Sequence, residues 1–265
     1  MKPFTQKLLP ESHKIQKHDR VRVVSLEADV CDHNSAIERV AVLAKGREGA
    51  YVCFGTVHMI MESHDSPEFG SKVNAADMIV PDGMPLVWMQ RLRGRKNAKR
   101  VRANDLMIML CEYAEKHELR VGFYGGKPDV IDAIIARAAN DFPKLNIAYS
   151  YSPPFRQLTI GEDAKIIARI NESGTQILFI GLGCPKQENW MAAHKSQLKC
   201  VMLGVGASFD FYAGHVKESP EWLGTLGLEW LHRLTQEPKR LWKRYLILNP
   251  RFMWLAVLQL LRLEK

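Results

Sequence analysis

The residues of this sequence that could act in acid–base chemistry include an aspartate at the end of a predicted buried strand. Residues 78–81 are apolar, and Asp82 and Gly83 follow directly. A carboxylate on a tight turn at the carboxyl end of a strand points into the crevice of an open α/β sheet, where it can take a proton from an attacking hydroxyl. Asp-Gly is also ordinary turn or N-cap chemistry. Asp82 is therefore a candidate general base, with a purely structural role as the alternative.

Glycine-rich loops follow three other predicted strands, at residues 125–127, 181–187 and 204–206. Glycine lets the backbone approach a phosphate, and a helix that begins after such a loop offers free N–H groups and its positive dipole end. The third glycine of G-x-G-x-x-G is missing, so the dinucleotide fingerprint is incomplete. The loops predict a rim that binds a diphosphate. Its candidate residues are Gly125, Gly126, Lys127, Gly181, Leu182, Gly183, Lys186 and Gly206.

A basic segment precedes a predicted helix at residues 103–117. Arg100 and Arg102 lie in it, and either can neutralise a diphosphate leaving group, because electrostatic stabilisation is often the largest catalytic contribution. The alternative is a solvated basic loop that continues residues 91–99. His58, just after the strand end at Thr56, is the histidine that we place near the site.

The elements that must position these residues follow a βαβ pattern. We predict strands at residues 21–25, 51–56, 78–81, 121–124, 146–150, 176–181 and 200–204, and helices at 35–45, 103–117, 128–141, 162–171 and 186–195. Apolar strands that alternate with helices of 10–15 residues predict a parallel sheet. The fold class is therefore α/β, Rossmann-like and doubly wound, with a core at residues 21–214 after an N-terminal extension at 1–20.

Composition excludes several classes of protein. The five cysteines are scattered without a C-x-x-C pair, which argues against a disulfide framework or a zinc site. The sequence contains no D-x-D, H-E-x-x-H, G-x-S-x-G or Walker A motif, and its histidines do not cluster, so we expect no metal. We expect neither a secretory signal nor a spanning helix, because the required apolar segments are missing. We therefore expect a cytoplasmic protein.

The C-terminal segment, residues 215–265, has a different character. The chain carries a net charge of +8, and residues 230–265 hold eight Lys/Arg against Glu237 and Glu264. At 100° per residue, Lys239, Arg240, Lys243 and Arg244 fall on one side of a helix, with Leu241, Trp242, Tyr245 and Leu248 on the other. A basic amphipathic helix followed by a Trp/Leu-rich one, at 252–263, is typical of a helical appendage that binds an anionic membrane surface. The alternative is a helical pair that packs on its own domain.

Taken in order, these motifs resemble the WecG/TagA/CpsF family, glycosyltransferase family 26. The resemblance runs from about residue 20 to the end. It rests on Thr56-Val57-His58, Pro81-Asp82-Gly83, Arg100-Val101, Asn104-Asp105-Leu106, Tyr124-Gly125-Gly126-Lys127, Gly181-Leu182-Gly183, Pro185-Lys186-Gln187-Glu188, Gly204-Val205-Gly206 and the tail at 226–238.

The resemblance implies an inverting, metal-independent transferase without a cofactor. It would move a sugar from a UDP-sugar to a saccharide on a polyprenyl diphosphate, at the inner face of the cell membrane, in cell-surface or exopolysaccharide biosynthesis. Asp82 would be the general base. Thr56 and Gln187 would line the pocket, Arg100 would contact the donor diphosphate, and the appendage would attach to the membrane and help complete the site. We expect no nucleic-acid partner and leave homo-oligomer formation open.

Two positions depart from the family pattern. His58 stands where an asparagine is common, and Arg102-Ala103 replace Thr-Gly. Both departures bear on the donor, which can be of the N-acetylmannosamine type or glucose. The competing hypotheses are a non-catalytic Rossmann-like nucleotide-binding module whose basic tail binds nucleic acid, and an NAD-linked oxidoreductase.

Overall fold

The computed structural model describes residues 19–225 and 227–261, and the fold described below refers to them. The strands are β1 (Arg20–Val23), β2 (Leu26–Asp29), β3 (Ala50–Gly55), β4 (Met78–Pro81), β5 (Arg120–Gly125), β6 (Asn146–Tyr151), β7 (Ile177–Gly181) and β8 (Val201–Gly204). The helices are α1 (His33–Gly46), α2 (Val57–Asp65), α3 (Pro67–Asn74), α4 (Met84–Leu92), α5 (Ala103–Lys116), α6 (Pro128–Asp141), α7 (Ile160–Glu172), α8 (Lys186–His194), α9 (Ser208–Tyr212), α10 (Glu221–Thr225), α11 (Glu229–Gln236) and α12 (Pro238–Leu260).

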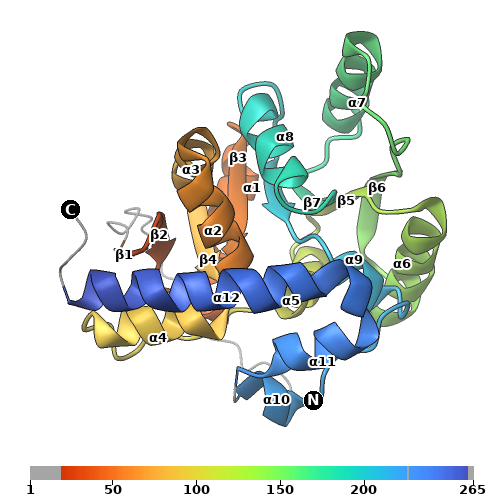
Figure 1. The fold of residues 1–265 in the computed structure, drawn as a ribbon. Coiled ribbons are helices and arrows are strands. Elements are labelled where there is room, and N and C mark those ends of the chain that lie inside the picture. The colour runs from red at the N-terminus through yellow and green to blue at the C-terminus, as the bar shows by residue number, and fades with distance from the viewer. Residues whose placement is uncertain (1–18, 226, 262–265) are drawn as a thin grey trace.

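Six strands form one parallel sheet in the order β4-β3-β8-β7-β5-β6, with helices on both faces (Figure 1). Successive residues of a strand point to opposite faces, so Ile177 and Phe179 join one apolar cluster while Leu178 and Ile180 join the other. Strands that are buried on both faces are apolar throughout, which is why they could be recognised in the sequence. The predicted α/β, Rossmann-like class is confirmed.

The first predicted strand belongs elsewhere. Residues 20–23 pair in antiparallel fashion with β2, and this hairpin is a separate two-stranded sheet rather than part of the parallel sheet. The turn passes through Val24, whose φ of 56° is unusual for a β-branched residue. Asp29 at the end of the hairpin is buried and accepts a hydrogen bond from the N–H of Ile79 at 2.7 Å. The prediction missed β2 because the strand is only four residues long and contains Glu27, Ala28 and Asp29, residue types that are depleted in strands.

The C-terminal segment forms α10, α11 and α12, and α12 differs from the prediction. It is one helix of 23 residues with Pro250 inside it, not a helical pair. Its inner side packs into an apolar cluster through Phe252 and Ala256, and Arg251 forms a bidentate ion pair with Asp65 at the end of α2, at 2.7 and 2.8 Å. Among the described helices, none combines the length and apolar character that crossing a membrane requires. The division at residues 214/215 stays a prediction.

The structure shows how the two predicted sides of the basic helix sit on the protein. Arg240 and Arg244 of the basic side line the large cavity described below. On the apolar side Leu241 and Tyr245 are buried, whereas the Trp242 side chain is 45% exposed. The two-sided pattern alone therefore did not define which edge of the helix packs inward.

Candidate active site

The carboxyl ends of β3, β4, β5, β7 and β8 meet at one edge of the sheet, as parallel strands require. A cavity of about 1430 Å³ lies there, and the C-terminal helices α11 and α12 supply part of its wall. Most predicted site residues line it: Thr56, His58, Asp82, Gly126, Lys127, Gly181, Leu182, Gly183, Lys186, Gln187 and Gly206. Arg100 and Gly125 are not among the described residues that form its lining.

Asp82 lies in a turn that is fastened to the end of β3. The N–H groups of Asp82 and Gly83 both donate to the carbonyl of Gly55, at 3.1 Å each. The next residue of β3's loop, Thr56, caps α2 by accepting from the N–H of Met59. The Asp82 carboxylate reaches the cavity, with its side chain 21% exposed. Burial, together with the negative charge of Glu229, raises the pKa of Asp82 against the opposing effect of Arg100.

Arg100 is held by carboxylates of its own chain. Its Nη2 lies 2.7 Å from Glu229 Oε2 and 3.6 Å from Asp82 Oδ1, and its Nε donates to the Asp82 carbonyl. Burial works to raise the pKa of Glu229, but Arg100 and Arg102 outweigh it, so the pKa is lowered and Glu229 remains ionised. The role of Arg100 at a donor diphosphate stays a prediction. Its present partners favour a role in positioning the Asp82 turn.

Arg102, one of the departures from the family pattern, joins the same layer of ion pairs. Its Nη2 lies 2.9 Å from Glu218 Oε2, and its Nη1 lies 3.3 Å from Asp105 Oδ1. Asn104 donates to the other oxygen of Glu218 at 2.7 Å. The extra charge of Arg102 therefore fastens the segment that leads into α10 onto the start of α5.

Gln187 is a buried brace between two loops. Its Oε1 accepts from the N–H of Gly183 at 3.1 Å, while its Nε2 donates to Gly204 O at 2.7 Å and to Glu188 Oε1 at 2.8 Å. A side chain at Gly204 would collide with this amide. With its hydrogen-bonding capacity used inside the protein, Gln187 fixes the shape of the cavity rim.

The glycine loops shape the cavity more than they supply free donors. At Gly125, where φ is 115°, a Cβ atom would lie 2.7 Å from the backbone of Gly181, so this glycine permits two loops to touch. The N–H groups of Gly126, Gly183 and Gly206 donate to Gly181 O, Gln187 Oε1 and Ile180 O. These three amides are engaged within the protein and are therefore not free to bind an anion.

His58 is uncharged near neutral pH. Burial, with a further contribution from Arg244, lowers its pKa from 6.5 to about 4. Its Nε2 lies 3.4 Å from Glu62 Oε1 one turn along α2. A neutral imidazole can exchange hydrogen bonds with a hydroxyl but adds no positive charge to the cavity.

Three arginines of the C-terminal helices, Arg233, Arg240 and Arg244, line the cavity and were missed by the sequence analysis as site residues. Arg240 is paired with Glu237 at 2.6 Å. Arg233 of α11 and Arg244 of α12 line the cavity, and within the described part of the chain neither forms an ion pair and neither Nε has a hydrogen-bond partner. Burial and the neighbouring charges of Arg233 and Arg240 lower the pKa of Arg244. A buried guanidinium without a carboxylate is costly to the protein alone and is suited to an anionic ligand. Arg233 lies in the family motif at residues 226–238, and that motif was the feature of the sequence that could have identified it as a site residue.

Two lysines also line the cavity, Lys127 and Lys186. Lys186 Nζ lies 5.3 Å from the centre of the Phe155 ring. Across residues 19–225 and 227–261, the His, Cys, Asp and Glu side chains form no group of three or more that could hold a metal ion. Independence of metals stays a prediction.

These features define an α/β enzyme whose cavity contains a carboxylate of raised pKa together with arginines that form no ion pair among the described residues. Such arginines are suited to bind an anionic group. Comparison with known proteins narrows the class. A model of the glycosyl transferase family WecG/TagA/CpsF matches residues 21–265, and the chain belongs to this family.

Two relatives carry the same functional name, N-acetylglucosaminyldiphosphoundecaprenol N-acetyl-beta-D-mannosaminyltransferase. The protein from Bacillus spizizenii (strain W23) is 31% identical over 200 residues, which cover 75% of this chain and 76% of the relative. The protein from Bacillus subtilis (strain 168) is 34% identical over 176 residues, which cover 66% of each chain.

The charges around Asp82 predict that two substitutions shift the pKa of Asp82 in opposite directions. Glu229→Gln removes a negative neighbour and should lower the pKa of Asp82, whereas Arg100→Gln removes a positive neighbour and should raise it. The measurement is an NMR titration of the carboxyl carbon, assigned with Asp82→Asn. Glu112→Gln, an exposed change on α5, should leave the titration unaltered. Shifts in the same direction would contradict the charge arrangement described here.

Proposed function

We propose that the protein transfers a sugar from a UDP-sugar to a saccharide carried on a polyprenyl diphosphate. The observation that carries the proposal is the Asp82 carboxylate in a cavity that also holds the unpaired guanidinium groups of Arg233 and Arg244. The names of the two relatives supply the acceptor class and an N-acetylhexosamine as the first donor to test. Both substrates carry a diphosphate, which matches a cavity lined by unpaired cations.

The proposed chemistry is a single displacement without a metal. Asp82 takes the proton from the acceptor hydroxyl, whose oxygen forms a bond to the anomeric carbon. The bond from that carbon to the phosphate oxygen breaks, and UDP departs with the electron pair, so the anomeric centre is inverted. A raised pKa suits a carboxylate for this task, because a base works best when its pKa approaches the operating pH.

In this proposal the charge of departing UDP is met by side chains. Among the described residues Arg233 and Arg244 form no ion pair that a phosphate would have to displace, whereas Arg100 is paired to Glu229 at 2.7 Å. Lys127, which precedes α6, and Lys186, the first residue of α8, add two further charges after β5 and β7. His58, neutral and in the same cavity, is placed to contact a sugar hydroxyl, so it is our candidate for donor selection.

We also propose that the enzyme works at the inner face of the cell membrane, with α12 lying on the lipid. Its outer side carries exposed apolar residues, and the exposed Lys239 and Lys243 lie on the same helix. The apolar residues are Trp242, Leu246, Ile247, Met253, Trp254, Val257, Leu260 and Leu261. An exposed apolar strip with basic residues along it matches an interfacial helix, and a polyprenyl acceptor would be presented at that surface.

The transfer reaction itself is the first test. We expect turnover with one of a panel of UDP-sugars, including UDP-N-acetylmannosamine and UDP-glucose, and a polyprenyl-diphosphate N-acetylglucosamine mimic. Asp82→Asn should keep its affinity for UDP but lose transfer by about 100-fold or more, the usual contribution of a general base. Asp129→Asn on the exposed surface of α6 serves as control. Near-normal turnover by Asp82→Asn would refute its role as base, and failure to bind UDP would refute the donor class.

The two unpaired arginines give a second test. Arg233→Ala and Arg244→Ala should each lower kcat/KM for the donor by about tenfold or more, because a hydrogen bond to a charged group contributes about 1.5–3 kcal/mol. Lys239→Ala, which removes an exposed charge from α12, should leave kcat/KM near the wild-type value. Steady-state kinetics at saturating acceptor measure the effect. Equal losses in all three variants would point to general electrostatics instead.

Membrane association is tested by vesicle co-sedimentation. Leu246→Glu with Trp254→Glu should release the protein from vesicles that contain anionic lipid, because both side chains are more than half exposed and would have to enter the headgroup region. Ile160→Glu, at an exposed position on α7, should not alter binding. Retained binding by the double variant would contradict the assignment of α12 as the lipid-facing element.

A further inference from the structure

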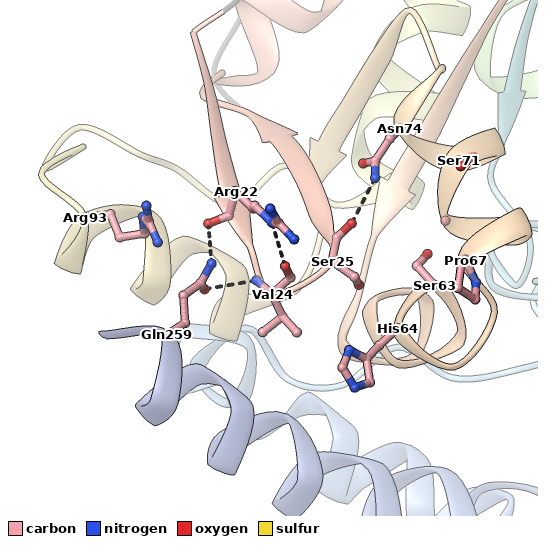
Figure 2. A pocket seen from close by; sticks show the side chains of 11 residues that line it. Arg22, Val24, Ser25, Ser63, His64, Pro67, Ser71, Asn74, Arg93 and Gln259 are labelled. Atoms are coloured by element: carbon pink, nitrogen blue, oxygen red, sulfur yellow. Dashed lines mark hydrogen bonds between the residues drawn. The ribbon is translucent and has the colours of Figure 1, made fainter. Parts of the chain in front are cut away.

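A second cavity, of about 760 Å³, lies between the β1–β2 hairpin, helices α2 and α3, the end of α4 and the last turns of α12 (Figure 2). It shares no lining residue with the candidate active site. Gln259 lines it and Arg244 lines the active site, and 15 residues of helix separate them by about 22 Å. Its volume lies within the range of about 300–1,000 Å³ of small-ligand sites.

The charge of this second cavity is positive. Arg22 and Arg93 line it, and none of its described lining residues is acidic. Of the carboxylates that neighbour the lining residues in sequence, Asp65 is paired with Arg251 at 2.7 Å, Glu68 is paired with Lys72 at 2.7 Å, and Glu62 contacts His58 at 3.4 Å. Within the described residues Arg93 has no ion-pair partner, and Arg22 uses only its Nε, which donates to the carbonyl of Val24.

A buried hydroxyl in the same cavity lacks a partner. Ser63 is only 4% exposed, and among the described residues its Oγ has no hydrogen-bond partner. An unpaired buried hydroxyl costs free energy, so its presence in a polar cavity points to a ligand that supplies the missing hydrogen bond. Ser71 of α3 adds a second hydroxyl to the lining.

The wall of the cavity is held rigid by amide side chains, as Figure 2 shows. Gln259 accepts from the N–H of Val24 at 3.0 Å and donates to Arg22 O at 3.3 Å, while Asn74 donates to Ser25 O at 2.9 Å. These bonds hold the hairpin turn in which Val24 takes its positive φ. A turn fixed in this way keeps the backbone of Arg22 in place beside the cavity, which reduces the ordering cost of binding.

We propose that this second cavity binds a phosphate group, and that its source is the headgroup of an anionic phospholipid. Two arginines and two hydroxyls are the donors that a phosphate oxygen accepts from. The lipid source follows from position, because the turn of α12 that lines the cavity through Gln259 also exposes Val257, Leu260 and Leu261. This choice of source rests on the proposed membrane association of α12, whereas the phosphate site itself rests on the cavity alone.

The experiment titrates the full chain with three soluble probes: dihexanoyl-phosphatidylglycerol below its micelle concentration, dihexanoyl-phosphatidylcholine, and inorganic phosphate. Calorimetry gives Kd, and the amide NMR signals of Ser63 and Gly70 report the location. We expect the phosphatidylglycerol probe to bind most tightly. Arg22→Ala with Arg93→Ala should weaken it roughly 30-fold, since each basic residue contributes about 1 kcal/mol. Lys45→Ala with Lys96→Ala, exposed lysines that line neither cavity, is the charge-matched control.

Ser63→Ala separates a ligand role from a structural one. Removing an unpaired buried hydroxyl should leave the thermal stability of the ligand-free protein unchanged or slightly higher. The same change should weaken the binding of the phosphatidylglycerol probe. Inorganic phosphate that binds as tightly as phosphatidylglycerol supports the phosphate site and overturns the lipid source. Equal affinity for phosphatidylcholine overturns the choice of an anionic lipid. Equal binding by the two double variants, or no binding by any probe, overturns the site. Sugar transfer enters none of these readouts, so its failure stays distinguishable.

Discussion

The ion pair between Arg100 and Glu229 joins parts of the chain that are 129 residues apart. Both side chains are largely buried, and an isolated buried charge costs several kcal/mol, so each residue depends on the other for a stable position. Because Arg100 also contacts the carbonyl and the carboxylate of Asp82, the same pair fixes the turn of the candidate base and the placement of α11. The active-site cavity therefore has its present shape only when the C-terminal helices are docked on the core.

This arrangement separates two groups of charged side chains in and beside the cavity. Asp82, Arg100, Arg102, Glu218 and Glu229 satisfy one another in a layer that needs no ligand. Arg233 and Arg244 stand outside that layer and form no ion pair among the described residues. A partly buried arginine without an ion pair adds little to the stability of the protein alone, and it is suited to bind an anionic ligand. The first group holds the Asp82 turn and α11 in place, and the second group is available to attract an anionic ligand.

The sequence could predict the features that local patterns determine. The strands of the parallel sheet are apolar throughout, and most candidate residues follow their carboxyl ends, so the class of fold and the edge of the sheet that holds the cavity could be inferred. It could not predict features that depend on distant partners. Gln187 looks like a ligand-binding amide until Gly183, Gly204 and Glu188 are seen to occupy it. Arg244 could not be told from Lys243 without knowing which edge of α12 packs inward.

The two sides of α12 obey different requirements. The inner side is accounted for by folding: Leu241, Tyr245, Phe252 and Ala256 are buried, and Gln259 holds the hairpin. The outer side has no such account, because Trp254 and Leu261 remain 64% and 62% exposed and contribute little to the core. One part of α12 lies beside the candidate active site and another is bonded to the β1–β2 hairpin, so the helix cannot turn its exposed apolar strip inward without losing both sets of contacts. The fold therefore keeps the strip exposed, and this exposure is what supports the proposed contact of α12 with a lipid surface.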